Sequence, residues 1–387
     1  MTLSRRSFLS AAGVALGSAL GSTVSAGRGN ATPDGTARDA RGAEARGTAP
    51  AAAGVGATPT SKHRIRRGVA MYSYQEDFFV RQMSVEDCLR EMSDIGAYGV
   101  ELLAEMMVPN FPNPPAAWVD QWHGWIEKYH LQPACYTQFI DSLRTRTHTL
   151  NVQEGVDTML RDIHLAKRLG IPRIRALIGT PVDILEATVP HLEKEDIWLG
   201  VELHFPVHIH GRLVERLLKI AEKTRHFGFV PDMGIFQNKP NPYLRDHMIR
   251  QGVLSPDAAA FIENAWANHK PQAAVAAEVA RMNGGPAAAG YVANVFMIRP
   301  ENPRDLIPIM SRCRHIHGKT WGLGEDDVDP AIDLTQVIPA LIEGGFDGVI
   351  ATEYEGQRHV QDVAPFSAVE MIRRHQVMLR RLLGEIA

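Results

Sequence analysis

Short apolar runs alternate with amphipathic stretches along most of this chain. Runs of roughly four to eight apolar residues bounded by turn residues predict buried strands, whereas apolar residues recurring every three or four positions predict helices. Strands of the first kind are expected at residues 68–74, 98–105, 133–140, 173–179, 198–205, 227–232, 313–319 and 348–354. A helical stretch follows each of them, and one such stretch opens with a capping signature at Ser84 and Asp87.

This alternation predicts an α/β fold with a parallel sheet. Eight strand–helix units in about 320 residues fit a (β/α)8 TIM barrel, which we place over residues 63–387. An open doubly wound sheet is the alternative, but no GxGxxG turn follows the first strand. Between about residues 237 and 311 the strand–helix alternation stops and several helical segments follow one another, which predicts a helical insertion after strand six. That insertion leaves from the face where TIM barrels carry out chemistry, so it either covers the site or serves packing or dimerisation.

The first 62 residues lie outside this pattern. Residues 1–26 contain the pair Arg5–Arg6, then a weakly apolar Gly/Ala-rich run, then the small residues Val24–Ala26. This order predicts a twin-arginine signal peptide and hence export to the periplasm or beyond. The run holds too much Gly and Ser for a membrane span. Residues 27–62 are rich in Ala, Gly, Thr and Pro and are expected to form a disordered linker.

Composition narrows the functional classes. The chain is 45% hydrophobic and 22% charged, which is typical of a soluble globular enzyme, and its formal charge of −3 disfavours a nucleic-acid binder. Three widely spaced cysteines, Cys88, Cys135 and Cys313, form neither a zinc motif nor a disulfide framework. We expect three buried thiols.

Polar side chains gather at the C-terminal ends of the last four predicted strands. Residues two apart on a strand point to the same face, so these side chains converge on one barrel mouth. They are Glu202 and His204, then Asp232, then His315, His317 and Lys319, then Glu353 and Glu355. Carboxylates with imidazole and no thiolate suit Mn²⁺, Mg²⁺, Co²⁺ or Zn²⁺. Side-chain alternation does not separate Glu353 from Glu355, although Glu353 is nearer the barrel interior. Taken alone, any one of these polar residues could instead cap a helix or satisfy a core hydrogen bond.

The order Glu, Asp, His, Glu on strands five to eight resembles the xylose isomerase-like barrel superfamily of sugar isomerases and epimerases. The motifs that carry the resemblance are VELH (201–204), PDMGIF (231–236), HIHGK (315–319) and ATEYEG (351–356). The resemblance implies a divalent metal held by Glu202, Asp232, His317 and Glu353. In one departure, Ile235 stands where many sugar epimerases carry a histidine.

A narrower resemblance is to the large subunit of bacterial C-glycoside deglycosidases. It rests on MYSYQEDFF (71–79), FPN (111–113), PDMGIF and EYEG. It implies cleavage of 3-oxo-glycosides, a carbohydrate substrate and a divalent metal, commonly manganese. It also implies a small second subunit or a separate sugar 3-oxidoreductase, and an oligomer of identical or different chains.

On this resemblance, a base removes the C2 proton of the oxidised sugar and the aglycone leaves C1 by β-elimination, with cleavage of a C–O or a C–C bond. His204 is the expected base, because its ordinary pKa lies near neutrality. Lys319 is expected to stabilise the enolate or assist the leaving group. The expected substrate contacts are Tyr74, Gln75, His315 and Glu355.

Two other functions stay open. The first is a metal-dependent sugar isomerase or epimerase acting through an enediol, with Glu202 and Glu353 as proton carriers. The second is a non-catalytic exported sugar-binding protein, which the carboxylate cluster disfavours because binding a neutral sugar needs no set of metal ligands. An endonuclease of the same superfamily is disfavoured by the export signal, the negative net charge and the lack of a multi-histidine set.

Overall fold

A computed structural model describes residues 64–140, 147–363 and 367–386. The predicted signal peptide (1–26) and linker (27–62) lie outside the described residues, so twin-arginine export stays a prediction. Within the described part of the chain, no helix combines the length and apolar character that crossing a membrane would require.

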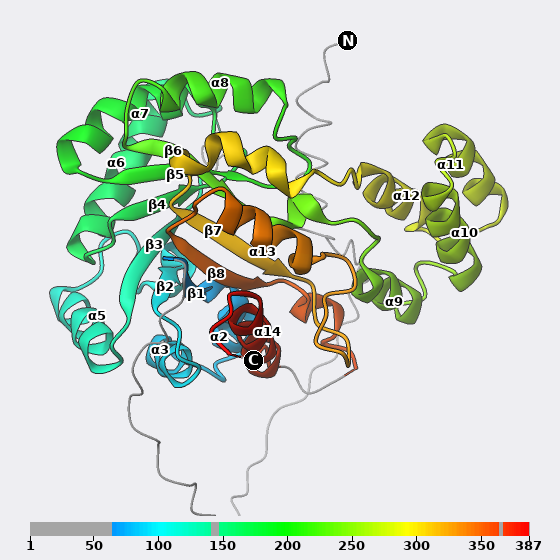
Figure 1. Cartoon of the computed structure of the whole chain (residues 1–387), viewed down its shortest axis with the longest axis horizontal. Helices are drawn as coiled ribbons and strands as arrows, with labels where there is room; N and C mark the ends of the chain where they lie inside the picture. The colour runs from blue at the N-terminus through cyan, green and yellow to red at the C-terminus, as the bar shows by residue number, and fades with distance from the viewer. Residues whose placement is uncertain (1–63, 141–146, 364–366, 387) are drawn as a thin grey trace, which may run out of the picture. The chain divides into compact units, whose positions relative to one another are not determined.

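Eight parallel strands form a nearly closed barrel with helices between them (Figure 1). They are β1 (Arg66–Ala70), β2 (Gly99–Leu102), β3 (Gln132–Gln138), β4 (Arg173–Ala176), β5 (Trp198–Leu203), β6 (Phe227–Pro231), β7 (His315–Thr320) and β8 (Val349–Tyr354). The strand order is β6-β5-β4-β3-β2-β1-β8-β7. Isolated parallel bridges, Phe229 to Cys313 and Asp232 to His317, join β6 to β7. The predicted (β/α)8 TIM barrel is confirmed.

The strands and helices of the barrel share one apolar core. Its helices are η1 (Met71–Tyr74), α2 (Gln75–Phe79), α3 (Val85–Asp94), α4 (Ala104–Met107), α5 (Ala116–Lys128), α6 (Val152–Arg168), α7 (Val182–Glu195), α8 (Arg212–Ala221), η2 (Met233–Phe236), η3 (Pro303–Arg312), α13 (Leu334–Glu343), η4 (Gln357–His359) and α14 (Val369–Leu382). Helix α3 begins with the predicted capping box, in which the Ser84 side chain accepts from the Asp87 amide and the Asp87 side chain accepts from the Ser84 amide. All three cysteines are free and buried, as predicted.

Several predicted strands extend past the observed strand ends, and the first two of them bear on the site. The first ends at Ala70, and residues 71–74 form the 3-10 helix η1; the second ends at Leu102, and α4 follows. An apolar run marks burial, and periodicity alone does not separate a buried strand from a buried helical turn. The difference matters for the site, because side-chain alternation holds only within a strand.

The predicted helical insertion after strand six is confirmed. It comprises α9 (Pro242–Arg250), α10 (Pro256–Ala267), α11 (Gln272–Arg281) and α12 (Ala288–Met297). Helices α10 to α12 share an apolar cluster of their own and lie beside the barrel (Figure 1). Helix α9 contacts η4, and Arg250 forms an ion pair with Asp362 at 2.9 Å. By contrast, η3 packs on α13 and contributes to the barrel core.

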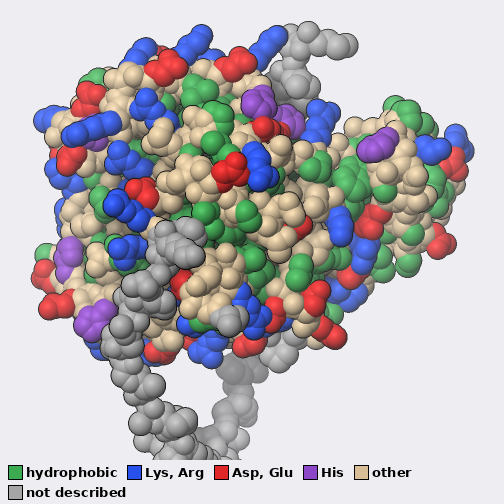
Figure 2. Space-filling model, in the orientation of Figure 1, with side chains coloured by type: hydrophobic (Ala, Val, Ile, Leu, Met, Phe, Trp, Pro, Cys, Tyr) green, Lys and Arg blue, Asp and Glu red, His purple; other side chains and the backbone are tan. Residues whose placement is uncertain are grey.

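The surface mixes both signs of charge. On the face shown in Figure 2, Lys and Arg side chains are interspersed with Asp and Glu over the barrel and the insertion. This distribution agrees with the small net charge of −3.

Candidate metal centre

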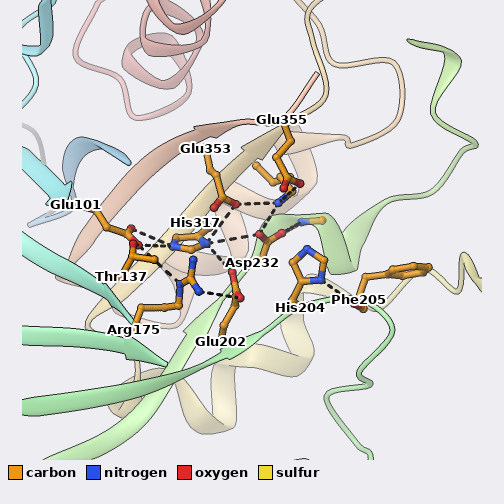
Figure 3. A network of polar contacts seen from close by, with 12 residues as sticks. Glu101, Thr137, Arg175, Glu202, His204, Phe205, Asp232, His317, Glu353 and Glu355 are labelled. Atoms are coloured by element: carbon orange, nitrogen blue, oxygen red, sulfur yellow. Dashed lines mark hydrogen bonds and ion pairs between the residues drawn. The ribbon is translucent and has the colours of Figure 1, made fainter. Parts of the chain in front are cut away.

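Four buried side chains from neighbouring strands converge at the C-terminal end of the barrel (Figure 3). Glu202 comes from β5, Asp232 directly follows β6, His317 comes from β7 and Glu353 from β8. One ligand atom from each lies within 4.8 Å of the others. The structure thus brings together the four residues that the resemblance implied as metal ligands. We call them the four-residue group.

His317 lies at the centre of this group. Its Nδ1 atom is 2.8 Å from Oε1 of Glu202, 3.3 Å from Oε2 of Glu353 and 3.6 Å from Oδ2 of Asp232. Among the described residues, Nδ1 has no hydrogen-bond partner. A buried nitrogen that faces three carboxylates without a hydrogen bond needs an explanation, and an ion is one of the usual ones.

The buried charges around His317 do not balance. Four buried carboxylates, those of Glu101 and the four-residue group, meet two buried permanent cations, Arg175 and Lys319. Uncompensated buried charge is costly, and one divalent cation would neutralise the excess of two negative charges. The residues therefore fit a divalent metal. Their oxygen and nitrogen donors suit Mn²⁺, Mg²⁺, Co²⁺ or Zn²⁺ and do not select one of them.

The carboxylates of the group are held in their charged form. Burial alone would raise the pKa of Glu202, but Arg175 and His317 outweigh burial and lower this pKa to about 2. Burial also opposes ionisation of Asp232, whose pKa is nevertheless lowered, chiefly by Lys319. The same holds for the pKa of Glu353, which His317 and Lys319 lower against the effect of burial. Deprotonated ligands are what metal binding requires.

Lys319 is surrounded by carboxylates. Its Nζ atom lies 3.0 Å from Asp232, 2.8 Å from Glu353 and 2.7 Å from Glu355. The Glu355 side chain is 17% exposed and that of Glu353 only 4%, so Glu355 lies nearer the rim. The structure therefore groups Glu353, and not Glu355, with the other three candidate ligands.

His204 lies just beyond the end of β5, beside the four-residue group (Figure 3). It is half-buried, and its Nδ1 atom is 2.6 Å from the carbonyl oxygen of Phe205. A carbonyl only accepts, so Nδ1 of the neutral ring carries the proton and Nε2 is the basic nitrogen. The position suits the predicted general base, which stays a prediction.

The residues expected to contact the substrate lie in different environments. Tyr74 is fully buried and lies near Glu91 and Cys88 of α3 and Arg373 of α14. Residues 71–74, predicted as part of the first strand, form η1. The Gln75 side-chain oxygen accepts from Arg358 at 3.2 Å. His315 is fully buried, and its Nε2 atom lies 2.7 Å from Glu101.

Several residues near the site were not predicted. The buried Glu101, Thr137 and Arg175 come from β2, β3 and β4. Tyr72, on η1, has its pKa raised by burial and then by the charge of Glu355, which places this tyrosine near Glu355. A signal for Glu101 and Arg175 exists in the sequence, because each is a charged residue inside an apolar strand. The predicted cluster was confined to the ends of strands five to eight.

The fold and this buried group define the class of protein. The chain belongs to the xylose isomerase-like TIM barrel family, whose model matches residues 89–381. The superfamily resemblance read from the strand-end motifs is therefore confirmed.

Two relatives share most of the chain. The 3'-dehydrocarminate deglycosidase alpha subunit of a Microbacterium species is 27% identical over 338 residues, which cover 83% of this chain and 96% of that protein. A C-glycoside deglycosidase alpha subunit of Arthrobacter globiformis is 26% identical over 335 residues, which cover 81% and 89% of the two chains.

Solved structures share the fold at low identity. A sugar phosphate isomerase/epimerase from Parabacteroides distasonis aligns with a TM-score of 0.51 at 12% identity over 85% of this chain and 96% of that chain. The IOLI protein with a bound zinc atom aligns with a TM-score of 0.50 at 12% identity over 83% and 98%. At this identity the two structures show the fold alone.

Proposed function

We propose that this protein is a divalent-metal-dependent lyase that cleaves 3-oxo-glycosides by proton abstraction at C2 and β-elimination of the aglycone. The observation that carries the proposal is the buried four-residue group with His204 beside it. Both relatives are named deglycosidase alpha subunits, and one is named for a 3'-dehydro substrate. These names support a glycoside-cleaving enzyme.

The four-residue group is the proposed holder of the metal, which when bound supplies Lewis-acid polarisation of the sugar oxygens. A 3-oxo group acidifies the neighbouring C2–H bond. Nε2 of His204 removes this proton, since the Phe205 carbonyl keeps the ring proton on Nδ1. The imidazolium that forms lies close to the negative charges of Glu202 and Asp232, which stabilise it.

Elimination then completes the reaction. The electron pair of the C2–H bond passes through the enolate of C2 and C3 and forms the C1–C2 double bond. The aglycone departs from C1 with its bonding pair and takes up a proton from water, while the His204 imidazolium returns its proton to the solvent. Nζ of Lys319 already faces three carboxylates. We therefore assign Lys319 to charge compensation around the enolate, not to proton donation.

The substrate and its context follow from this chemistry. A 3-oxo-glycoside arises by oxidation of a glycoside at C3, so a sugar 3-oxidoreductase must supply it. Both relatives are named alpha subunits, which implies a further subunit, and we propose a second subunit for this chain as well. The twin-arginine signal in residues 1–26 supports export of the enzyme to the periplasm or beyond.

The test compares substrates with and without EDTA. The purified protein is given a 3-oxo-glycoside, the unoxidised glycoside, and free aldoses and ketoses, and products are separated by liquid chromatography and mass spectrometry. We expect aglycone only from the oxidised glycoside, loss of this activity with EDTA, and recovery with Mn²⁺. Matched C- and O-glycosides identify the bond cleaved.

If a second subunit is needed for aglycone release, this chain can still be tested through a partial reaction. Exchange of the substrate C2 proton in D₂O reports proton abstraction by this chain alone. Interconversion of free sugars would instead establish an isomerase or epimerase. Sugar binding without exchange or turnover would establish a binding protein.

A further inference from the structure

A second layer of buried polar side chains lies behind the four-residue group. Glu101, Thr137 and Arg175 come from β2, β3 and β4, and His315 comes from β7 (Figure 3 shows the first three). Each of these side chains is at most 3% exposed. The proposed reaction assigns these residues no step.

We infer that Glu101 is a positioning residue that fixes the His317 ring with Nδ1 as its metal-binding atom, and that Thr137, His315 and Arg175 hold Glu101 in place. This inference rests on the proposed metal site. It adds a layer of residues on strands that contribute no proposed ligand.

The contacts of Glu101 set the proton positions on both histidines. Its two oxygens lie 3.2 and 3.0 Å from Nε2 of His317, and Oε2 lies 2.7 Å from Nε2 of His315. An ionised carboxylate only accepts hydrogen bonds. Both rings therefore carry a proton on Nε2 and donate it to Glu101.

The consequence for His317 is a defined tautomer. With the proton on Nε2, the neutral ring presents the lone pair of Nδ1 to Glu202, Asp232 and Glu353, at 2.8 to 3.6 Å. A metal-binding histidine commonly donates its other ring N–H to a carboxylate, which fixes the ring and raises the basicity of the ligand nitrogen. Glu101 stands in that position.

Two further neighbours contact the Glu101 carboxylate. The Thr137 hydroxyl donates to Oε1 at 2.6 Å. Nε of Arg175 lies 3.8 Å from Glu101, and Nη1 lies 3.6 Å from Oε2 of Glu202. Arg175 thus links the supporting carboxylate to a proposed ligand and compensates charge on both.

Glu101, His315 and His317 could instead hold a second ion, because their ligand atoms also lie within 4.8 Å of one another. Their separations of 2.7 to 3.2 Å are those of hydrogen bonds, which already use the Glu101 oxygens. We therefore favour the positioning role. Metal stoichiometry separates the two cases.

The experiment uses the Glu101→Gln and Thr137→Val variants of the full chain. A glutamine at position 101 carries no negative charge and replaces one accepting oxygen with an NH₂ donor, so the hydrogen bonds from His317 become fewer and weaker. The matched control is Asp162→Asn, which alters a buried carboxylate that contacts Arg161 and Tyr136, on the opposite face of β3 from Thr137. Thr137→Val keeps the Glu101 carboxylate and removes only the hydroxyl that donates to it. This variant provides the test if Glu101→Gln fails to fold.

Two measurements are made on each variant. Electron paramagnetic resonance of free Mn²⁺ gives affinity and stoichiometry, and ¹⁵N NMR of the protein loaded with diamagnetic Zn²⁺ gives the His317 tautomer. We expect one ion per chain, affinity weakened about 10- to 100-fold in Glu101→Gln and by less in Thr137→Val, and no change in the control. The wild-type ring should carry its proton on Nε2, and Glu101→Gln should alter the nitrogen shifts of His317.

Three results would overturn the inference: unchanged Mn²⁺ affinity in folded Glu101→Gln, a proton on Nδ1 of wild-type His317, or two ions per chain that fall to one in Glu101→Gln. If the wild type takes up no divalent ion, the metal dependence of the proposed function fails. The Nε2–H signal of His317, compared between metal-free wild type and Glu101→Gln, then still decides whether Glu101 orients the His317 ring.

Discussion

Nζ of Lys319, on β7, lies 3.0 Å from Oδ2 of Asp232, which follows β6. This ion pair crosses the junction where the barrel closes through isolated bridges, one of which joins Asp232 to His317. The contact therefore has two consequences. It compensates buried negative charge at the candidate metal centre, and it ties the two terminal strands of the sheet order together.

Replacing Lys319 with methionine should destabilise the metal-free protein strongly. The change leaves Asp232, Glu353 and Glu355 without their buried cation, and removal of one partner from a buried ion pair costs about 3–5 kcal/mol. Urea unfolding gives the free energy of unfolding. The control is Lys223→Met, which breaks an exposed pair with Glu186 and should change stability little. A loss no larger than in the control would refute the role given to Lys319.

Replacing Glu202 with glutamine should reduce the metal content. The substitution preserves shape but removes one of three ligand charges, so bound metal should fall by roughly tenfold or more at limiting metal concentrations. Elemental analysis after dialysis provides the measurement. Glu193→Gln, an exposed change on α7, should retain full content. Full content in Glu202→Gln would exclude Glu202 from the ligand set.

Replacing His204 with alanine should separate chemistry from metal binding. Metal content should stay at the wild-type level, whereas C2 proton exchange and aglycone release should fall by about 10² or more, the usual contribution of a general base. The matched control is His210→Ala, because His210 lies on the same loop and pairs with Asp305. Equal rates in wild type and His204→Ala would assign the base to another residue.

The stability of the protein should depend on pH through His375. Burial lowers the pKa of His375 to about 3, below its ordinary value of 6.5. Nδ1 of His375 lies 2.8 Å from the Thr352 hydroxyl, which also accepts from Gln376. Between about pH 6.5 and 3 the unfolded chain binds a proton here that the folded chain does not, so the free energy of unfolding falls by up to about 1.4 kcal/mol per pH unit as pH drops.

The measurement compares wild type with His375→Gln, which has no titrating group at this position. The difference in free energy of unfolding between the two proteins should shrink as pH falls from about 6.5 towards 4 and stay constant above about 7.5. A difference that does not vary with pH would show that His375 titrates normally in the folded protein.

Much of the fold could be predicted because each barrel unit leaves a strong local pattern. Helix α13 (Leu334–Glu343) follows the seventh predicted strand as the alternation indicates, and the Ser84 cap forms as its spacing indicates. The errors lie at strand ends. Residues 71–74 continue an apolar run but turn into η1, because burial continues past the point where strand pairing stops. On η1, Tyr72 lies near Glu355 and Tyr74 lies near Glu91 of α3.

The proposed ligands could be predicted because they lie at the ends of consecutive strands, where barrel geometry forces convergence. The supporting layer was harder to predict. Glu101 meets His317 from β2, across a sequence separation of 216 residues, and no local pattern reports such a contact. Only a charged residue within an apolar strand hints at it. The choice between Glu353 and Glu355 likewise depends on how deeply each side chain is buried, and side-chain alternation along a strand does not supply this.

The separate apolar cluster of helices α10 to α12 has a thermodynamic consequence. These helices bury their side chains chiefly against one another, so their opening need not disrupt the barrel strands. Native-state hydrogen exchange should therefore resolve two cooperative units, with amides of α10 and α12 exchanging through an opening of lower free energy than those of β5 and β8. Helices α10 to α12 can therefore change their packing, by mutation or on contact with another molecule, while the strands that carry the carboxylates keep their geometry.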